Sequence, residues 1–298
     1  MLKTISLTFI ALLAFAGNSV LCRLALNDDV IDAASFTSIR LSSGIIFLLL
    51  LVIIKNRQST DLQSIDLKKI DLKVGSWLSS LFLFVYALAF SYAYLTLDTG
   101  TGALILFGSV QVTMIVFGLI KGKRLIWLEW LGLFISFMGL IVLLMPGASA
   151  PSLIGFLLMA LSGIAWGFYT LAGQSSKDSL NETANNFLRT LPFIILLTLF
   201  TFDQVQLSNQ GILLAVTSGA ITSGLGYAIW YSALKELTIT HAAIIQLTVP
   251  IIATFGGVIF SNEVISIRLI SSSILVLGGV LLVISGKYYV DVFKRSKH

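Results

Sequence analysis

Long apolar stretches alternate with short polar ones along the whole chain. Ten of the apolar stretches have about 17 to 25 residues, the length that an α-helix needs to cross a bilayer. Because lipid offers the backbone no hydrogen bonds, each stretch predicts a membrane-spanning helix. The expected helices cover 4–25, 35–54, 74–96, 100–119 and 125–145, then 152–172, 184–201, 210–233, 239–260 and 266–286. The pattern predicts an all-α integral membrane protein with ten transmembrane helices.

The composition agrees with lipid as the main solvent. Of the 298 residues 57% are hydrophobic and 11% charged, whereas about a quarter of a soluble domain is charged. The first apolar stretch is too long for a signal-peptide core, so we expect a retained helix. A single cysteine, Cys22, excludes an intrachain disulfide, and HExxH, GxSxG and phosphate-loop motifs are absent. We expect no enzyme, cofactor, metal site or nucleic-acid partner.

The loop charges orient the expected helices. Lysines and arginines gather in the loops after the second and fourth helices and in the C-terminal tail, on the same side as Lys3. Opposite loops carry Asp32, Asp98 and Asp203. By the positive-inside rule, both termini are cytoplasmic. We expect a multi-pass protein of a bacterial-type inner (plasma) membrane, with membrane lipid as its surroundings.

The two halves of the chain resemble each other. Arg40, early in the second expected helix, pairs with Arg189, early in the seventh. Six further positions match at an offset of 139, namely Ala89, Tyr92, Ala103, Val110, Gly118 and Gly139 with Ala228, Tyr231, Ala242, Val249, Gly257 and Gly278. We therefore expect a first five-helix repeat at 1–147, a second at 148–288 and a basic tail at 289–298.

An odd number of helices per repeat inverts the second half relative to the first. Inverted repeats are the architecture of many secondary transporters, which bind their substrate near the membrane midplane between the halves. Glycines such as Gly132, Gly219, Gly278 and Gly279 are expected to let helices approach closely. The repeat predicts alternating access but identifies no substrate.

Several of these segments carry a family resemblance. The first helix of each half contains a small-residue segment, Ala16-Gly17-Asn18 or Ala165-Trp166-Gly167, and each half has the arginine of its second helix. The run from His241 to Pro250 leads to a proline and is followed by Asn262-Glu263. In these features the chain resembles the drug/metabolite transporter superfamily, in its EamA-type branch.

The first half departs from this pattern, since Gln111 replaces the proline and Lys123-Arg124 stands at the Asn262-Glu263 position. The resemblance implies a ten-helix transporter with a central cavity, which often exports amino acids, metabolites or toxic compounds. Substrate identity does not transfer across so diverse a family.

Polar and aromatic side chains within spans are the candidate site residues, because burying them in lipid is costly. The alternative for each is interhelical packing or hydrogen bonding. The substrate-binding candidates are Asn18, Tyr86, Gln111, Trp166, Tyr169, Tyr227, Trp230 and Gln246. Arg40, Arg189 and His241 are candidate gating or mouth charges. The alternative for the arginines is snorkelling to lipid phosphate or hydrogen bonding to loop carbonyls, and for His241 it is a capping or interfacial role. Pro250 marks either a hinge or a static kink.

Acidic residues fall at expected helix ends, and none lies mid-span. Proton-coupled carriers commonly use a buried carboxylate, so we expect a neutral or zwitterionic solute. The favoured function is a secondary transporter that exports a small organic solute, such as an amino acid or another metabolite. Proton-coupled efflux of drugs or toxic compounds is the alternative, and a membrane-embedded lipid enzyme is less favoured. The oligomeric state is not readable from the sequence.

Overall fold

The computed structural model describes residues 2–27, 30–58, 74–122, 125–145, 150–173, 176, 178–234, 236–237 and 245–295. Within these ranges every regular element is a helix, apart from one antiparallel bridge between Ile31 and Leu207. The expected all-α membrane fold is confirmed.

The first half has five helices close to the expected positions. They are α1 (Leu2–Asn27), α2 (Ala33–Gln58), α3 (Trp77–Tyr94), α4 (Thr99–Ile120) and α5 (Trp127–Leu144). Polar side chains cap the first turns of α3 and α5. Ser76 accepts a hydrogen bond from the Ser79 N–H at 3.0 Å, and Glu129 accepts one from the Ile126 N–H at 2.7 Å. These caps satisfy backbone donors that have no partner within the helix.

The second half is more broken. The expected helix at 184–201 is two helices, and the one at 210–233 contains a π-helical segment. The elements are α6 (Leu153–Gly173), α7 (Ser179–Leu188), α8 (Leu191–Phe200), the short η2 (Phe202–Gln204), α9 (Asn209–Thr217), the π-helix η3 (Ser218–Leu225), α10 (Gly226–Leu234), α12 (Val249–Ser261) and α13 (Ile267–Arg295).

Two prolines account for the break between α7 and α8 and for the break before α12. Pro192 lies in the first turn of α8, and Pro250 in the first turn of α12. A proline ring clashes with the carbonyl four residues earlier, so the preceding helix has to end. The placement of Pro250 inside one continuous helix was therefore wrong. An interruption at Leu247 and Thr248 precedes it, and Pro250 begins a new helix.

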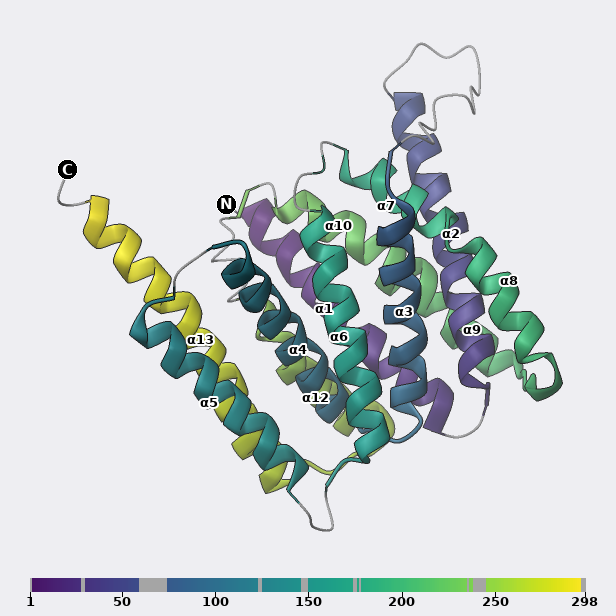
Figure 1. The fold of residues 1–298 in the computed structure, drawn as a ribbon. Helices are drawn as coiled ribbons and strands as arrows, with labels where there is room; N and C mark the ends of the chain where they lie inside the picture. Colours follow the sequence, from purple (N-terminus) through teal and green to yellow (C-terminus); the bar gives the residue numbers. More distant parts are fainter. Residues whose placement is uncertain are drawn as a thin grey trace.

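The packing of the helices is reciprocal between the halves (Figure 1). Helix α3 packs on α6 of the other half, and the corresponding α10 and η3 pack on α1. Helices α4 and α12 contact α6 and α1 respectively, and they also contact each other. These exchanged pairs are the contacts of two inverted five-helix repeats. The repeat boundaries at 147 and 288 stay a prediction.

Helices α5 and α13 form a pair at one edge of the molecule (Figure 1). A side chain on Gly132 would overlap the Gly279 carbonyl, and one on Gly279 would overlap the Gly132 carbonyl. Their expected role in close packing is confirmed. For Gly278 the expectation was wrong, because an added Cβ would meet nothing within 4 Å.

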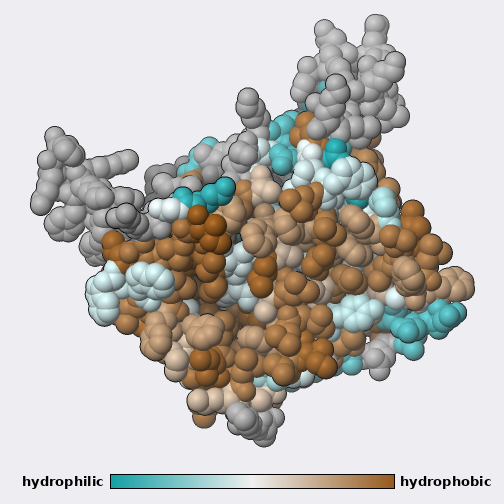
Figure 2. Space-filling view, viewed as in Figure 1, coloured by the Kyte–Doolittle hydropathy of each residue, from teal (hydrophilic) through white to brown (hydrophobic). Residues whose placement is uncertain are grey.

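Apolar residues cover most of the face of the molecule that Figure 2 shows. Phe134, Phe200 and Ile267 are among the exposed apolar side chains of the protein, at 63%, 85% and 85%. Among the described residues, nine helices are long and apolar enough to cross a membrane, and the apolar helix Val249–Ser261 is shorter. The beginning of α1 and the end of α13 lie on the same face (Figure 1). The protein is a multi-pass membrane protein, and the cytoplasmic placement of that face stays a prediction.

Candidate functional site

A small cavity lies between the two halves. Both halves contribute to its wall, which consists of Phe15, Asn18, Tyr86, Phe90, Leu106, Phe107, Trp166 and Tyr227. Its volume is about 20 Å³, and a cavity needs roughly 10–15 Å³ to hold one water molecule. A solute therefore fits only when the helices around this cavity separate.

Aromatic rings dominate one side of the cavity. The indole of Trp166 lies 4.8 Å from the Tyr86 ring, 5.4 Å from Tyr169 and 5.0 Å from Tyr227, measured between centroids. Phe15 contacts Tyr227 and also reaches Trp230 at 5.6 Å. Such tilted and stacked pairs prefer one another over aliphatic neighbours. They give the cavity flat, apolar walls.

A polar group lies directly behind this wall. The Arg40 side chain is 1% exposed, and its Nη2 donates to the Tyr86 hydroxyl at 2.9 Å. Its Nε donates to Ser223 Oγ at 3.3 Å. The guanidinium carbon lies 5.3 Å from the Tyr86 centroid and 4.9 Å from that of Phe90, within the range of cation–π attraction.

Asn18 joins this group from α1. Its Nδ2 donates to the Tyr86 hydroxyl at 3.2 Å, so this hydroxyl accepts from both Asn18 and Arg40. The Asn18 Oδ1 accepts from Ser218 at 2.6 Å and from Thr222 at 3.2 Å. Both donors to the Asn18 side-chain oxygen thus come from the π-helix η3.

The π-helix brings its hydroxyls to this place because it approaches α2 closely. A Cβ on Gly219 would overlap the Arg40 carbonyl oxygen and Ser43 Oγ. Only glycine lets the two backbones come so near. π-Helical segments occur frequently at functional sites, where they change the direction of side chains.

Arg40 is a buried charge without a carboxylate partner among the described residues. The described ion pairs are Arg23 with Asp98 and Glu263, and Lys55 with Asp178. Desolvating an ion costs on the order of several kcal/mol even after the protein relaxes. Because its side chain is buried, Arg40 does not extend to lipid phosphate. Arg40 lies behind the cavity wall and not at a mouth.

The predicted residues divide into two sets. Asn18, Tyr86, Trp166 and Tyr227 line the cavity, and two others touch its wall: Tyr169 contacts Trp166, while Trp230 contacts Phe15.

Gln111 and Gln246 lie elsewhere. Gln111 is 3% exposed on α4, one turn beyond Phe107, and its Nε2 has no hydrogen-bond partner in the structure. Gln246 is half-buried just before the interruption that precedes α12.

Arg189 and His241 do not join the central group either. Arg189 stands at the break between α7 and α8, and its Nη1 donates to the Val74 carbonyl at 2.9 Å. This contact ties the break to the start of α3. His241 lies outside the described residues.

Sequence reasoning missed the hydroxyls of η3 and the three phenylalanines and one leucine of the cavity wall. The missed residues are Phe15, Phe90, Leu106, Phe107, Ser218, Thr222 and Ser223. Thr217-Ser218-Gly219 and Thr222-Ser223-Gly224 are two hydroxyl-and-glycine clusters inside an apolar stretch. That repetition was the available signal, whereas the phenylalanines had no feature that separated them from lipid-facing ones.

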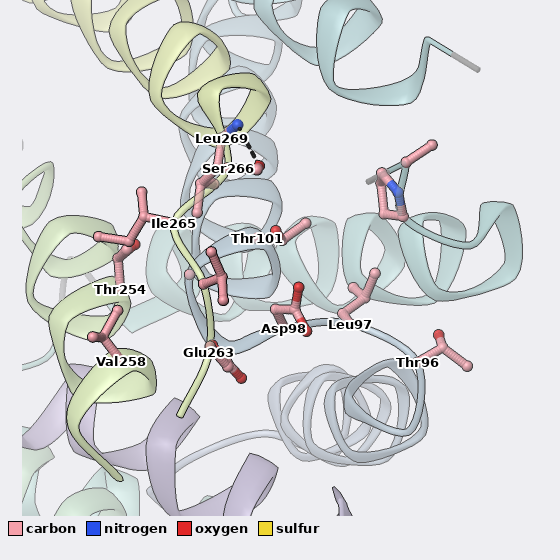
Figure 3. Close-up of a pocket in the computed structure, with 14 residues that line it drawn as sticks. Thr96, Leu97, Asp98, Thr101, Thr254, Val258, Glu263, Ile265, Ser266 and Leu269 are labelled. Atoms are coloured by element: carbon pink, nitrogen blue, oxygen red, sulfur yellow. Dashed lines mark hydrogen bonds between the residues drawn. The ribbon is translucent and has the colours of Figure 1, made fainter. Parts of the chain in front are cut away.

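A larger pocket (Figure 3) lies among the helix ends on the face away from the chain termini (Figure 1). Its volume is about 320 Å³, and it is lined by the ends of α4, α12 and α13 together with Ala150 and Pro151. Asp98 and Glu263 are its acidic residues. Both Glu263 oxygens accept from the Thr99 N–H at 2.9 Å, and Arg23 Nε lies 3.4 Å from Glu263 Oε1.

These bonds join several helix ends on that face. Glu263 compensates the positive end of the α4 dipole. Arg23 also donates to the Tyr94 carbonyl at 3.0 Å and lies 3.5 Å from Asp98. One arginine of α1 is therefore tied to α3, to the start of α4 and to the segment after α12.

A second set of bonds lies on the opposite face, which holds the beginning of α1 and the end of α13 and is called the terminus face below. Lys55 Nζ lies 2.9 Å from Asp178 Oδ1, which joins α2 to the start of α7. Partial burial raises the pKa of Asp178, but the Lys55 ammonium and Asn181 outweigh this and hold it below its usual value. A small polar pocket nearby, lined by Tyr169, Glu182, Thr183 and Asn186 among others, reaches the ring that stacks on Trp166.

Among the residues that the structure describes, no group of three or more His, Cys, Asp or Glu side chains is placed to hold a metal ion. The chemistry of the site is therefore that of aromatic faces, hydroxyls, one amide and one guanidinium. Such groups bind and orient a solute.

Comparison with known proteins identifies related sequences. The model of the EamA-like transporter family matches residues 2–145 and again 153–285. An uncharacterized protein of Pseudomonas aeruginosa is 48% identical over 283 residues, which cover 95% of each chain. An uncharacterized transporter of Archaeoglobus fulgidus is 24% identical and covers 63% of this chain and 68% of its own.

One solved crystal structure has a similar fold. It superposes with a TM-score of 0.63 at 17% identity and covers 93% of this chain and 96% of its own. At that identity the likeness concerns the fold alone.

Proposed function

The chain belongs to the EamA-like transporter family, and on that premise we propose that it is a secondary transporter which exports a small organic solute across the inner membrane by alternating access. Amino acids and other metabolites are the proposed substrates. The cavity between the repeats is the proposed binding site, with Asn18, Tyr86, Trp166 and Tyr227 in its wall.

The observation that carries this proposal is the position of the cavity. It is lined by α1, α3 and α4 of one half and by α6 and α10 of the other, so a relative motion of the halves changes its access. Separate sets of ion pairs close the two faces above and below it. A site enclosed between inverted repeats is the arrangement that alternating access requires.

Proton-coupled drug efflux receives less support. The described Asp and Glu side chains near the spans lie at helix ends, as Glu129 and Glu263 do in capping α5 and α4. A buried cation next to the cavity also repels cationic drugs.

Counterflow in proteoliposomes tests the proposal. Vesicles loaded with an unlabelled amino acid or metabolite should take up the labelled compound with saturable kinetics, with or without an imposed pH gradient. Trp166→Ala should reduce the flux at least about tenfold, because the ring contacts three tyrosines around the cavity.

Trp130→Ala is the matched control, since Trp130 is 55% exposed on α5 and its loss should leave the flux unchanged. Flux only with a pH gradient would favour the proton-coupled alternative. Absence of counterflow for every compound in a broad panel would contradict the proposal.

A further inference from the structure

The guanidinium of Arg40, which has no carboxylate partner among the described residues, is the feature that the fold does not explain. Its Nη1 has no hydrogen-bond partner, although the side chain is 1% exposed. Each terminal nitrogen of a guanidinium carries two N–H donors, and a buried donor without an acceptor is destabilising. A charge left in this condition next to a binding cavity indicates that its counter-ion arrives from outside the chain.

We propose that Arg40 receives the anionic head of the transported solute, and that the substrates are small monoanions, carboxylates or sulfonates, with an apolar body about the size of an aromatic ring. This inference rests on the proposed function and specifies its substrate class. A planar guanidinium pairs with such heads through two parallel hydrogen bonds.

Access to Arg40 runs past two rings of the cavity wall. Tyr86 and Phe90 both line the cavity, and their ring centroids lie 5.3 Å and 4.9 Å from the guanidinium carbon. When the cavity widens and the Tyr86 ring shifts, its hydroxyl gives up its bond to Nη2 and donates to the arriving anion. Binding of the anion then also changes the hydrogen bond of Asn18, because Asn18 and Arg40 donate to the same Tyr86 hydroxyl.

The remainder of the wall suits an apolar body. Phe15, Leu106, Phe107, Trp166 and Tyr227 contribute apolar or aromatic surface. Flat rings of this kind stack on an aromatic or otherwise flat group at little entropic cost.

A second charge on the solute has no partner here. The Asn18 oxygen already accepts from Ser218 and Thr222, and no described carboxylate lines the cavity. An ammonium group would also lie near Arg40 and be repelled. The absence of a mid-span carboxylate led to the expectation of a neutral or zwitterionic substrate. The position of Arg40 beside the cavity favours a monoanion over a zwitterionic amino acid instead.

Binding of three probes with the same ring separates the head groups. Phenylacetate, phenylacetamide and phenethylammonium share a benzyl group and carry a negative, neutral or positive head. We expect phenylacetate to raise the thermal unfolding temperature of the purified protein and to change its tryptophan fluorescence, with at least about tenfold higher affinity than the amide. Phenethylammonium should bind weakest, and phenylalanine should not exceed the amide.

Variants of Arg40 assign the preference. Arg40→Gln should remove the advantage of phenylacetate over phenylacetamide and leave binding of the amide within about twofold. Arg40→Lys keeps the charge but not the paired donors, so it should retain the order of affinities at a lower affinity for the anion. Arg268→Gln, on the peripheral helix α13, removes one positive charge elsewhere. It should change neither the affinity for phenylacetate nor that for phenylacetamide.

The outcomes distinguish the two proposals. Equal affinities for the three heads, tighter binding of the amide or the ammonium, or no binding of any probe would overturn the role of Arg40, even if counterflow of other solutes proves transport. If Arg40→Gln does not fold, the head-group order in the wild type and Arg40→Lys decides. An Arg40→Gln protein that keeps the full preference for phenylacetate would show that Arg40 is only a structural tie.

Discussion

At the scale of single residues, the Tyr86 hydroxyl holds the centre together. It accepts hydrogen bonds from Arg40 on α2 and from Asn18 on α1, while its own helix is α3. Three helices thus depend on one oxygen atom. Because buried donors are costly when left unpaired, the loss of this oxygen affects more than one bond.

Tyr86→Phe should therefore destabilise the protein by about 1–3 kcal/mol, since it leaves an Arg40 and an Asn18 donor without their acceptor. Thermal unfolding of the purified variant in detergent measures this. Tyr92→Phe is the matched control on the same helix, because the Tyr92 hydroxyl makes no hydrogen bond among the described residues. Equal unfolding temperatures for the two variants would contradict the assigned role of the Tyr86 hydroxyl.

Part of the central group could be predicted from residue type alone. Asn18 and Trp166 stand out because polar or amphipathic side chains within apolar stretches need partners. The meeting of Arg40 with Tyr86 could not be predicted, because it depends on how closely α2 approaches η3 at Gly219. The position of Arg40 in the sequence showed only that it lies within the first turns of its helix.

At the scale of elements, the contact between α2 and η3 fixes where the hydroxyls of the π-helix point. Gly219→Ala should destabilise the protein by roughly 3 kcal/mol or more, because its methyl would overlap backbone of α2 at Arg40. Gly278→Ala is the control, since its Cβ would meet nothing and alanine favours a helix. Its unfolding temperature should equal or exceed that of the wild type; a comparable loss in both variants would rule out the close contact.

Element positions followed from apolar length, and element breaks did not. The ends of α4 lie within one residue of the expected 100–119, because lipid dictates the length of a span. The break at Arg189 and Thr190 is shorter than one turn, so the hydropathy of 184–201 stays high across it. Pro192 was its local signal, and it acts through a clash that hydropathy does not measure.

At the scale of the whole molecule, the inverted repeat predicts which face each loop occupies. In a Cys22→Ala background, Asp203→Cys should react with a membrane-impermeant maleimide in intact cells, since η2 lies on the face away from the termini. Lys121→Cys, exposed at the end of α4 on the terminus face, should react only after permeabilisation. The reverse pattern would place the termini outside the cell.

The two sets of ion pairs hold the two faces closed, and their removal should shift access in opposite directions. Leu106→Cys in the Cys22→Ala background reports access to the cavity. Glu263→Gln removes the charge opposite Arg23 and should speed modification of this cysteine from outside by up to about fivefold. Asp178→Asn loosens the terminus face instead and should slow it.

Acid offers an independent check on the terminus face. Since the pKa of Asp178 in the folded protein is lowered, its stabilising contribution is complete at neutral pH and is lost only as the pH falls through that lowered value. At mildly acidic pH the Leu106→Cys reporter with Asp178 intact should therefore still react faster than the same reporter with Asp178→Asn, by the ratio seen at neutral pH, because loss of thiolate slows both alike. If Glu263→Gln and Asp178→Asn change the modification rate of Leu106→Cys in the same direction, the ion pairs stabilise the fold as a whole and do not hold separate faces.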